Sequence, residues 1–176
     1  MKYDVVVIGA GASGMMAAIQ AAKKCSSEDR NRGHACYGSC KRVALLEVLS
    51  RPGKKILITG NGKCNLTNYR LDESCYHTDS GSTEDIISVI DRFDSKAVTD
   101  FFREEGMLAR DRDGYVYPYS EQASSVLDCL RQCLAKYGID LICGCETASV
   151  KKKDNEFIIS GTIRDTQAEN SRADAK

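Results

Sequence analysis

Apolar residues near the start of the chain form a short continuous run, Val5-Val6-Val7-Ile8, rich in β-branched side chains. Such a run is typical of a buried strand in a parallel sheet. Residues 13–24 are rich in Met and Ala and end in two lysines, which suit the negative end of a helix dipole. A second short apolar run at 43–47 ends in an acid. Strand, helix and strand in this order predict a βαβ unit.

The stretch between this helix and the second strand, residues 25–41, is polar and contains Gly33, Gly38 and three of the nine cysteines. We predict a loop or insertion there. Residues 48–82 contain Pro52 and many glycines and asparagines, and this composition predicts irregular structure.

The middle of the chain predicts helices and a hairpin. Apolar positions at helical spacing predict two short helices, at 86–93 and 98–102, and the second stops at Gly106. Residues 108–119 predict a hairpin, because the Asp-Gly pair at 113–114 suits a tight turn.

The last part of the chain predicts a helix, a strand and another hairpin. Ser120 is the expected N-cap of a helix that Gly138 ends. Residues 139–160 then predict a strand followed by a hairpin. We expect residues 161–176, with one large apolar side chain, to be a frayed polar tail. The fold prediction is an α/β Rossmann-type domain over residues 1–160, with the insertion at 25–41.

Composition excludes several classes of protein. The 176 residues carry 25 basic and 25 acidic side chains, a formal net charge of zero, and 42% are hydrophobic. This apolar fraction is too high for a disordered chain. Zero net charge disfavours binding of nucleic acid through a general basic field. No apolar run approaches the roughly 20 residues of a membrane-spanning helix, so no membrane association is expected. The odd cysteine count and the absence of a signal-peptide pattern predict a reduced, cytoplasmic protein.

The segment Gly9-Ala10-Gly11-Ala12-Ser13-Gly14 matches the pattern G-x-G-x-x-G. It follows a predicted strand and opens a predicted helix, a context that favours a dinucleotide-binding loop over a merely glycine-rich turn. In such loops Gly9 allows the tight turn, Gly11 lets the backbone approach a pyrophosphate, and Gly14 lets the helix pack close to the strand. Ala12 and Ser13 stand in the first helical turn, whose free N–H groups hold phosphates.

Glu47 ends the second predicted strand, where an acid accepts hydrogen bonds from a ribose hydroxyl. It lies 33 positions after Gly14, whereas about 20 is usual. The insertion at 25–41 accounts for the excess. An acid here also disfavours a cofactor with a ribose 2′-phosphate. The alternative is an ordinary surface glutamate.

A second candidate site lies between Arg51 and Lys63, where four basic residues occur without an acid and Gly60 and Gly62 are interleaved. Glycines that expose backbone N–H groups beside cations make a cradle for an anionic group. A reduced flavin or a cofactor pyrophosphate is such a group. For this stretch alone, a solvated basic loop is the alternative.

These segments together resemble a bacterial family of NAD(P)/FAD-dependent oxidoreductases with aminoacetone-oxidase-like and bile-acid-reductase-like members. The resemblance runs through residues 9–14, 46–47 and 53–68, of which Thr-Gly-Asn-Gly-Lys-Cys-Asn-Leu-Thr-Asn is the most specific part. Residues 114–120 are similar to the family's later G-x-V-[FY]-P-x-S pattern. The resemblance covers about residues 1–160.

The resemblance implies that FAD is the cofactor and that its ADP half binds residues 9–14 and Glu47. It also implies that a second group lies near the pyrophosphate and the flavin: Lys55, Gly60, Gly62, Cys64 and Asn65. In related flavoproteins with two dinucleotide folds, the strand after the long helix meets the adenine through backbone groups. Here that strand points to Thr147.

The implied function is flavin-mediated hydride or electron transfer to a small-molecule substrate, with NAD(P)H as a candidate donor. Because the family's chains are longer, we expect this chain to be an N-terminal FAD-binding part that by itself binds FAD weakly and ADP well. One alternative is a dinucleotide-binding fragment without turnover of its own. The other is an NAD-binding dehydrogenase module, which the flavoprotein-like segment at 53–68 disfavours. No residue is assigned an acid–base role.

We predict no metal site and no flavin-linked dithiol. A dithiol with five-residue spacing would need a cysteine at 59 or 69 to partner Cys64, but these positions hold Thr and Tyr. Cys129 and Cys133 have a spacing that zinc sites use. However, they also fit the apolar stripe of the predicted helix, where a thiol packs as a small apolar group. His34 and His77 are expected to be surface residues.

Overall fold

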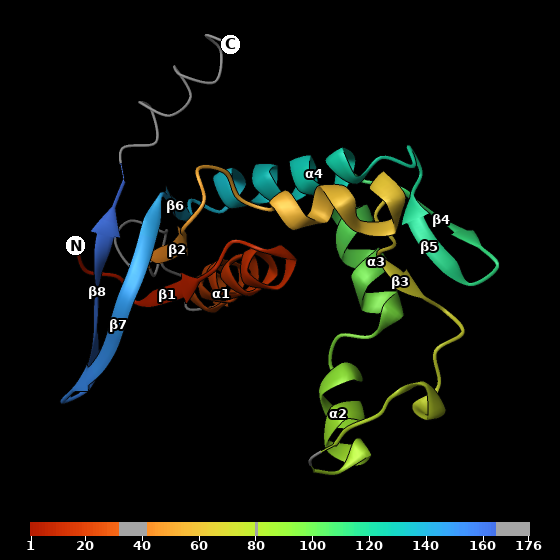
Figure 1. Cartoon of the computed structure of the whole chain (residues 1–176), viewed down its shortest axis with the longest axis horizontal. Helices are drawn as coiled ribbons and strands as arrows, with labels where there is room; N and C mark the ends of the chain where they lie inside the picture. The colour runs from red at the N-terminus through yellow and green to blue at the C-terminus, as the bar shows by residue number, and fades with distance from the viewer. Residues whose placement is uncertain (32–41, 80, 165–176) are drawn as a thin grey trace, which may run out of the picture. The chain divides into compact units, whose positions relative to one another are not determined.

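The computed structural model describes residues 1–31, 42–79 and 81–164 (Figure 1). Within these residues the chain forms two compact units. Unit 1 comprises the described residues of Met1–Lys54 and Leu130–Lys176, and unit 2 comprises those of Lys55–Cys129. Each unit has its own sheet structure.

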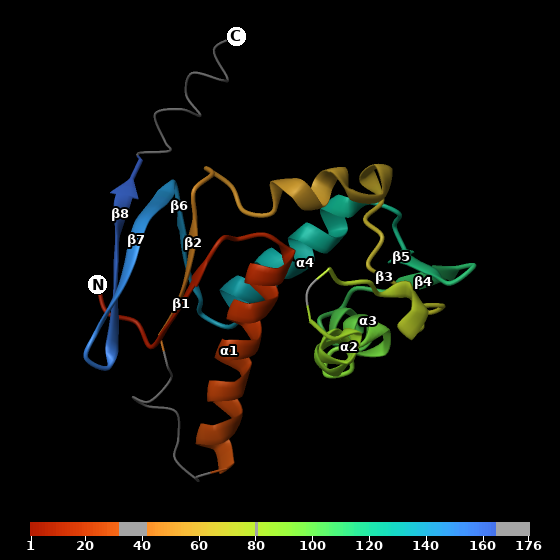
Figure 2. The ribbon, with the colours of Figure 1, turned by 60° about the horizontal axis from the view of Figure 1, so that its bottom comes forward.

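Unit 1 contains a three-stranded parallel sheet with the order β1-β2-β6. The strands are β1 (Val5–Ile8), β2 (Val43–Glu47) and β6 (Asp140–Cys143), and the crossover helix is α1 (Ala12–Asn31). Figure 2 shows the three strands side by side. Every residue of β2 is buried, as expected for the central strand of a covered parallel sheet. The predicted βαβ unit is confirmed.

Helix α1 continues to Asn31, seven residues beyond its predicted end at Lys24. The expectation of a loop from residue 25 is therefore wrong for residues 25–31. Their sequence, Cys-Ser-Ser-Glu-Asp-Arg-Asn, contains no glycine or proline that would end a helix. The rest of the predicted insertion, with Cys36, Cys40 and His34, lies outside the described residues.

The core of unit 1 forms between α1 and the sheet. The helix buries side chains at positions i, i+3, i+4 and i+7, the spacing of one helix face: Met15, Ala18, Ile19 and Ala22. This face packs against β1 and β2, where Leu45 is fully buried. This buried face orients α1 on the sheet, and it thereby orients the N-terminus of the helix.

Helix α4 (Ala123–Lys136) ends as the sequence predicts. Gly138 has φ of +64°, and the N–H of Ile139 donates to the carbonyl of Leu134 at 3.0 Å, which closes the last turn. Its start differs from the prediction, since the Ser120 hydroxyl accepts from the N–H of Gln122 at 3.3 Å, before the helix begins. The reason is Glu121, whose φ of +54° is not helical.

Cys129 and Cys133 are both buried in α4. Their predicted role as apolar residues of the helix stripe is confirmed.

Strands β7 (Cys145–Lys153) and β8 (Glu156–Ile163) form an antiparallel hairpin that turns at Asp154. The predicted hairpin is confirmed, but the predicted tail at 161–176 is wrong for residues 161–163, because pairing continues to Ile163. Residues 165–176 of the predicted tail lie outside the described residues. Gly161 permits this pairing, since a Cβ there would lie 2.2 Å from the carbonyl oxygen of Glu146.

Unit 2 contains a small antiparallel sheet in the order β3-β5-β4. Its strands are β3 (Thr67–Asn68), β4 (Ala109–Arg112) and β5 (Tyr115–Pro118). The predicted hairpin is confirmed: Asp113 and Gly114 have φ of 52° and 89°, the positive pair of a type I′ turn.

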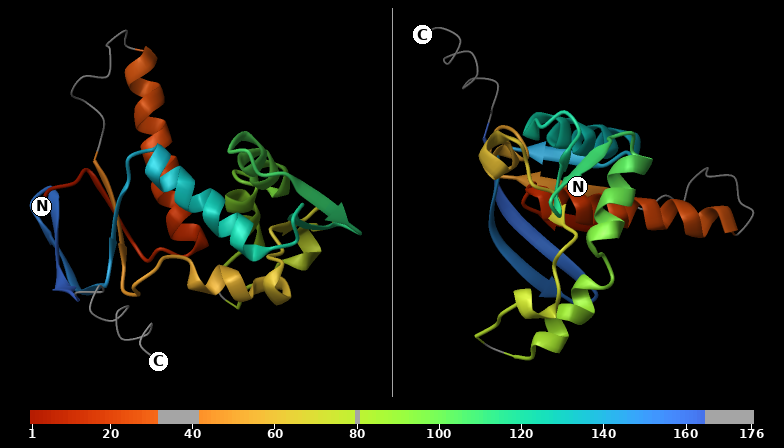
Figure 3. Two further views of the ribbon diagram at one scale, coloured as in Figure 1. Left: turned by 90° about the horizontal axis from the view of Figure 1, so that it is seen from above. Right: turned by 90° about the vertical axis from the view of Figure 1, so that its right-hand side faces the viewer.

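Short helical segments complete unit 2: η1 (Lys54–Gly62), η2 (Glu73–Cys75), α2 (Thr83–Ile90) and α3 (Ser95–Glu104). The backbone of η1 is not helical at Thr59, Gly60 and Asn61, where the segment is kinked. Ser82 and Asp94 cap α2 and α3 by accepting backbone hydrogen bonds from Glu84 and Ala97. Helix α3 packs against β3 and β4 (Figure 3). The two helices predicted between residues 86 and 106 are thus confirmed.

Candidate functional site

The glycine loop of unit 1 joins β1 to α1 and is fixed by backbone hydrogen bonds on both sides. The N–H of Gly9 donates to the carbonyl of Leu46 at 2.7 Å, and the N–H of Gly53 donates to the carbonyl of Ala10 at 2.9 Å. Gly9 has φ of +96°, in the region that favours glycine. The loop is therefore held at the carboxyl end of β2.

Gly14 and Gly11 meet opposite surroundings. A Cβ at Gly14 would lie 1.8 Å from the carbonyl oxygen of Gly9, so α1 packs closer to the loop than any side chain would allow. A Cβ at Gly11 would meet no atom within 4 Å. Gly14 is therefore required by packing of the protein, whereas Gly11 leaves free space beside an exposed backbone.

The N-terminus of α1 presents unpaired donors beside this space. The first helical hydrogen bond runs from the N–H of Met15 to the carbonyl of Gly11 at 3.0 Å. The preceding N–H groups of Ala12 and Ser13 have no partner within the helix. Both residues are exposed, and the first turn carries no acid. This helix end can therefore accept an anion.

Glu47 is 8% exposed, and both of its carboxylate oxygens accept backbone hydrogen bonds. Oε2 accepts from the N–H of Ala10 at 2.8 Å, and Oε1 accepts from the N–H of Leu49 at 2.9 Å. The alternative of an ordinary surface glutamate is wrong. Glu47 ties the glycine loop to the end of β2, and its remaining lone pairs can still accept from a ligand hydroxyl.

Thr147 stands in β7, near the same end of β2. The N–H of Gly144, just before β7, donates to the carbonyl of Leu49 at 3.0 Å. The Thr147 hydroxyl oxygen is buried and has no hydrogen-bond partner among the described residues. Buried polar atoms are almost always paired, so this hydroxyl is available to a group that is not part of the described chain.

The loop of unit 2 that holds the second predicted group is a tight left-handed turn. Gly60, Asn61 and Gly62 have φ of 53°, 53° and 82°. The N–H of Cys64 donates to the carbonyl of Thr59 at 3.0 Å. A Cβ at Gly60 would lie 2.9 Å from the backbone nitrogen of the residue at 65. The local backbone therefore needs glycine at position 60.

The structure separates the predicted site residues into two groups. Those of unit 1 are Gly9, Gly11, Ala12, Ser13, Gly14, Glu47 and Thr147. Those of unit 2 are Lys55, Gly60, Gly62, Cys64 and Asn65.

Two thiols near these groups have raised pKa values. Burial raises the pKa of the Cys64 thiol, although a hydrogen bond with Thr59 opposes part of the rise. Burial also raises the pKa of Cys143, and the charge of Glu47, its partner across the β2–β6 ladder, raises it further. A thiol reacts as its thiolate, so neither side chain is a ready nucleophile at neutral pH.

We expect iodoacetamide at pH 7.5 to modify Cys64 at least about tenfold more slowly than the exposed Cys75, because Cys64 is buried and its pKa is raised. Its rate should still climb above pH 9. Timed alkylation followed by peptide mass spectrometry measures both rates in one sample. A Cys64 rate that equals that of Cys75, or levels off below pH 8, would contradict the prediction.

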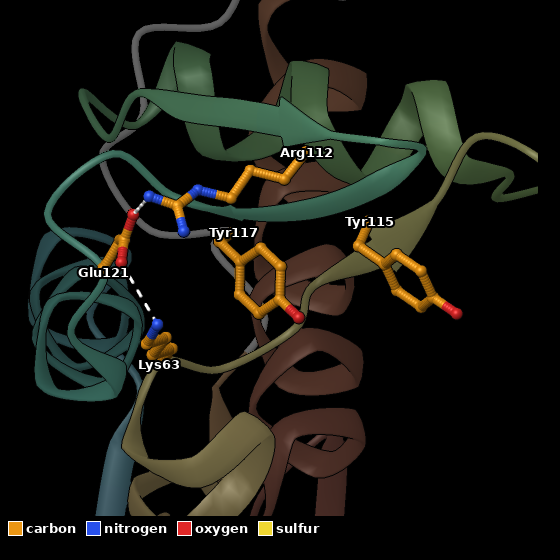
Figure 4. A pocket seen from close by; sticks show the side chains of 5 residues that line it. All are labelled: Lys63, Arg112, Tyr115, Tyr117 and Glu121. Carbon is orange, nitrogen blue, oxygen red and sulfur yellow. Dashed lines mark ion pairs between the residues drawn. The ribbon is translucent and has the colours of Figure 1, made fainter.

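Unit 2 also contains a pocket of about 160 Å³ that sequence reasoning missed. It is lined by Lys63, Arg112, Tyr115, Tyr117 and Glu121. Lys63 and Arg112 converge on Glu121, whereas the Tyr115 hydroxyl points away from it (Figure 4). The signal was present in the predicted hairpin, because a two-residue turn at 113–114 places Arg112 directly opposite Tyr115.

The described residues contain no group of three or more His, Cys, Asp or Glu side chains that could hold a metal ion. In the same part of the chain, no helix is long and apolar enough to cross a membrane.

The glycine loop, the buried acid and the parallel sheet have counterparts in known proteins. The family described as the HI0933-like protein Rossmann domain matches residues 3–173. The chain belongs to this FAD-binding Rossmann family. The predicted family is thereby confirmed.

Two curated relatives extend this finding. Over 153 residues the chain is 39% identical to a 3-dehydro-bile acid delta(4,6)-reductase of Clostridium scindens, covering 87% of the chain and 34% of the relative. It is 26% identical over 158 residues to a ribosomal RNA dihydrouridine synthase of Escherichia coli, covering 90% and 35%. The chain therefore spans about a third of the length of these relatives.

Solved structures show the same fold. Thermovibrio ammonificans THI4 has a TM-score of 0.52 at 17% identity, covering 97% of this chain and 50% of its own. The open conformation of a flavocytochrome c3 fumarate reductase has a TM-score of 0.50 at 16% identity, covering 87% and 28%. The predicted Rossmann-type fold, as one portion of a larger flavoprotein fold, is confirmed.

Proposed function

We propose that this chain binds the ADP half of FAD through its glycine loop, the N-terminus of α1 and Glu47. The observation that supports this most directly is the space at Gly11, where a Cβ would meet nothing within 4 Å. An extended anion needs such space to approach the backbone. The Ala10–Glu47 hydrogen bond holds the loop in the receptive conformation.

Each residue of the site has a task under this proposal. The N–H groups of Ala12 and Ser13 would hold the pyrophosphate, and Glu47 would accept a ribose hydroxyl. Thr147 would meet the adenine, and its unpaired buried hydroxyl supports a ligand at this position. In unit 2, the exposed Lys55 and Asn65 and the turn with Gly60, Gly62 and Cys64 would lie near the flavin.

The protein that contains this chain would be an FAD-dependent oxidoreductase that reduces a small-molecule substrate in the cytoplasm, with NAD(P)H as the donor. The 39% identical relative is a 3-dehydro-bile acid delta(4,6)-reductase, which supports the reductive direction. Bound FAD supplies hydride and electron transfer, while the chain binds and orients it. Cys64, with its raised pKa, would stay a neutral thiol.

The test is titration of the purified protein with ADP, FAD, NAD and ADP phosphorylated on its 2′-hydroxyl. We expect ADP and FAD to bind, and the 2′-phosphorylated ADP to bind at least about tenfold more weakly, because Glu47 would repel the extra phosphate. The full-length protein should purify yellow. Binding of NAD but not of FAD after reconstitution would overturn the proposal in favour of a dehydrogenase module.

The same titration on the isolated chain tests whether this chain alone holds the ADP half of FAD while the rest of the full-length protein is needed to hold the flavin. The chain should bind ADP almost as well as the full-length protein does, and FAD much more weakly. Tight, stoichiometric FAD binding with turnover by this chain alone would contradict that division.

A further inference from the structure

We propose that the β4–β5 hairpin and Lys63 form a binding site for the phosphate group of a small ligand. The site uses the pocket of unit 2 shown in Figure 4. None of its lining residues belongs to the set proposed to hold FAD, so the inference does not depend on FAD binding.

The register of the hairpin places cations opposite phenols. Arg112 faces Tyr115 across the two strands, and Arg110 faces Tyr117. Residues opposite one another in an antiparallel pair share one face of the sheet. On the other face, Val116 and Pro118 are buried. One face of the hairpin is thus a surface of two guanidinium groups and two phenols, all of which can donate hydrogen bonds.

The cations of this face outnumber their counterions. Glu121 forms ion pairs with Arg110, Arg112 and Lys63, the last with 3.4 Å between Nζ and Oε2. One carboxylate therefore serves three cations, and the cluster keeps two net positive charges. The Glu121 side chain is 20% exposed, so these charges are only partly screened by water.

Several donors of the cluster remain unused. An arginine has five N–H donors and a lysine has three, and a single carboxylate cannot accept from all of them. The Nε atom of Arg110 is buried and has no hydrogen-bond partner among the described residues. The Oε1 atom of Glu121 is likewise buried without a hydrogen-bond partner among the described residues, so the cluster leaves one donor and one acceptor unsatisfied.

The pocket walls suit a small anion. The left-handed turn with Gly60 does not line the pocket but packs behind one of its lining residues, since a Cβ at Gly60 would lie 3.5 Å from Cε1 of Tyr117. This contact shows that the turn and the Tyr117 ring lie against each other. Lys63 follows the turn directly and carries its charge into the pocket. A volume of about 160 Å³ admits an oxyanion group and excludes a large ring system.

The charge of the cluster favours phosphate over carboxylate. A phosphate monoester carries nearly two negative charges at neutral pH and offers three acceptor oxygens. It would neutralise the two net positive charges of the cluster, whereas a carboxylate would leave one positive charge. Guanidinium forks also bind phosphate through paired hydrogen bonds.

The proposal is tested by titrating the purified protein with inorganic phosphate at constant ionic strength, followed by ³¹P NMR. We expect saturable binding that weakens at least about tenfold in Lys63→Gln and in Arg112→Gln. Both side chains are about half exposed, so these variants should fold. Arg164→Gln is the matched control, because it removes an exposed, ion-paired arginine of unit 1 and should leave binding unchanged.

Acetate at the same ionic strength separates the two oxyanions. Acetate that binds as tightly as phosphate would overturn the assignment to phosphate. Absence of saturation at 50 mM phosphate, or equal binding in both variants, would overturn the site itself.

The Gly11→Val variant distinguishes failure of the phosphate-site proposal from failure of the proposed ADP-binding function. It should lose ADP binding and retain phosphate binding, because Gly11 lies in unit 1 and the cluster lies in unit 2. Joint loss of both would overturn the independence of the phosphate site.

Discussion

Replacing Gly11 by valine is expected to weaken ADP and FAD binding by at least about 100-fold, which corresponds to about 2.7 kcal/mol. The added side chain would fill the space beside the loop where the proposed pyrophosphate approaches. No protein atom lies within 4 Å of the new Cβ, so the fold should tolerate it. Gly11 directly precedes α1, where valine is a poorer N-cap than glycine, and the free energy of unfolding should fall by no more than about 1 kcal/mol.

Two further variants of the same helix sharpen this experiment. Ala17→Val introduces the same valine side chain at an exposed position of α1 and should bind ADP normally. Gly14→Ala should instead unfold unit 1, because its Cβ would lie 1.8 Å from the carbonyl oxygen of Gly9. Calorimetric titration with ADP and urea denaturation measure both properties. Normal ADP binding by Gly11→Val would remove the loop from the proposed site.

The parallel-sheet part of the fold could be predicted because its signals are local. Val5–Ile8 and Val43–Glu47 are continuous apolar runs, and the glycine motif between them has one well-known structural context. The helix end at Gly138 and the turn at Asp113-Gly114 could also be predicted, because Gly and Asp are residue types that favour turns and these positions have positive φ angles.

The boundaries that failed depend on features without a strong local marker. The end of α1 was placed at two lysines, although nothing after them stops a helix before Asn31. The start of α4 was placed at Ser120, but Glu121 adopts a left-handed conformation that glutamate rarely favours. The end of β8 depends on pairing with β7, a contact between distant residues.

The site was only partly accessible to sequence reasoning for the same reason. Glu47 was found from its place at a strand end, but its bond to the N–H of Ala10 joins residues 37 positions apart and has no sequence pattern. The cluster around Glu121 was missed because it needs three segments to meet. A charged residue in a loop usually faces solvent, and only the fold shows that this one serves three cations.

Glu47 fixes the loop on which the proposed site depends, so its loss should affect both stability and binding. In Glu47→Ala the N–H groups of Ala10 and Leu49 lose their acceptor, and Ala10 is fully buried. Hydrogen bonds to a charged group are worth about 1.5–3 kcal/mol, and an unpaired buried donor costs about 1–3 kcal/mol. Because Leu49 is exposed and its N–H can turn to water, we expect a total loss of about 2–4 kcal/mol.

This variant should lower the urea midpoint substantially and also abolish ADP binding, whereas Gly11→Val should abolish binding alone. Glu47→Gln should fall between wild type and Glu47→Ala, because its amide oxygen can accept one of the two N–H groups while its NH₂ faces the other. Glu146→Ala is the matched control: it removes an exposed acid that pairs with Arg164 and should cost no more than about 1 kcal/mol. A Glu47→Ala protein as stable as the Glu146→Ala control would show that the loop is held without the carboxylate. The interpretation that Glu47→Ala loses ADP binding because its glycine loop is destabilised would then be wrong.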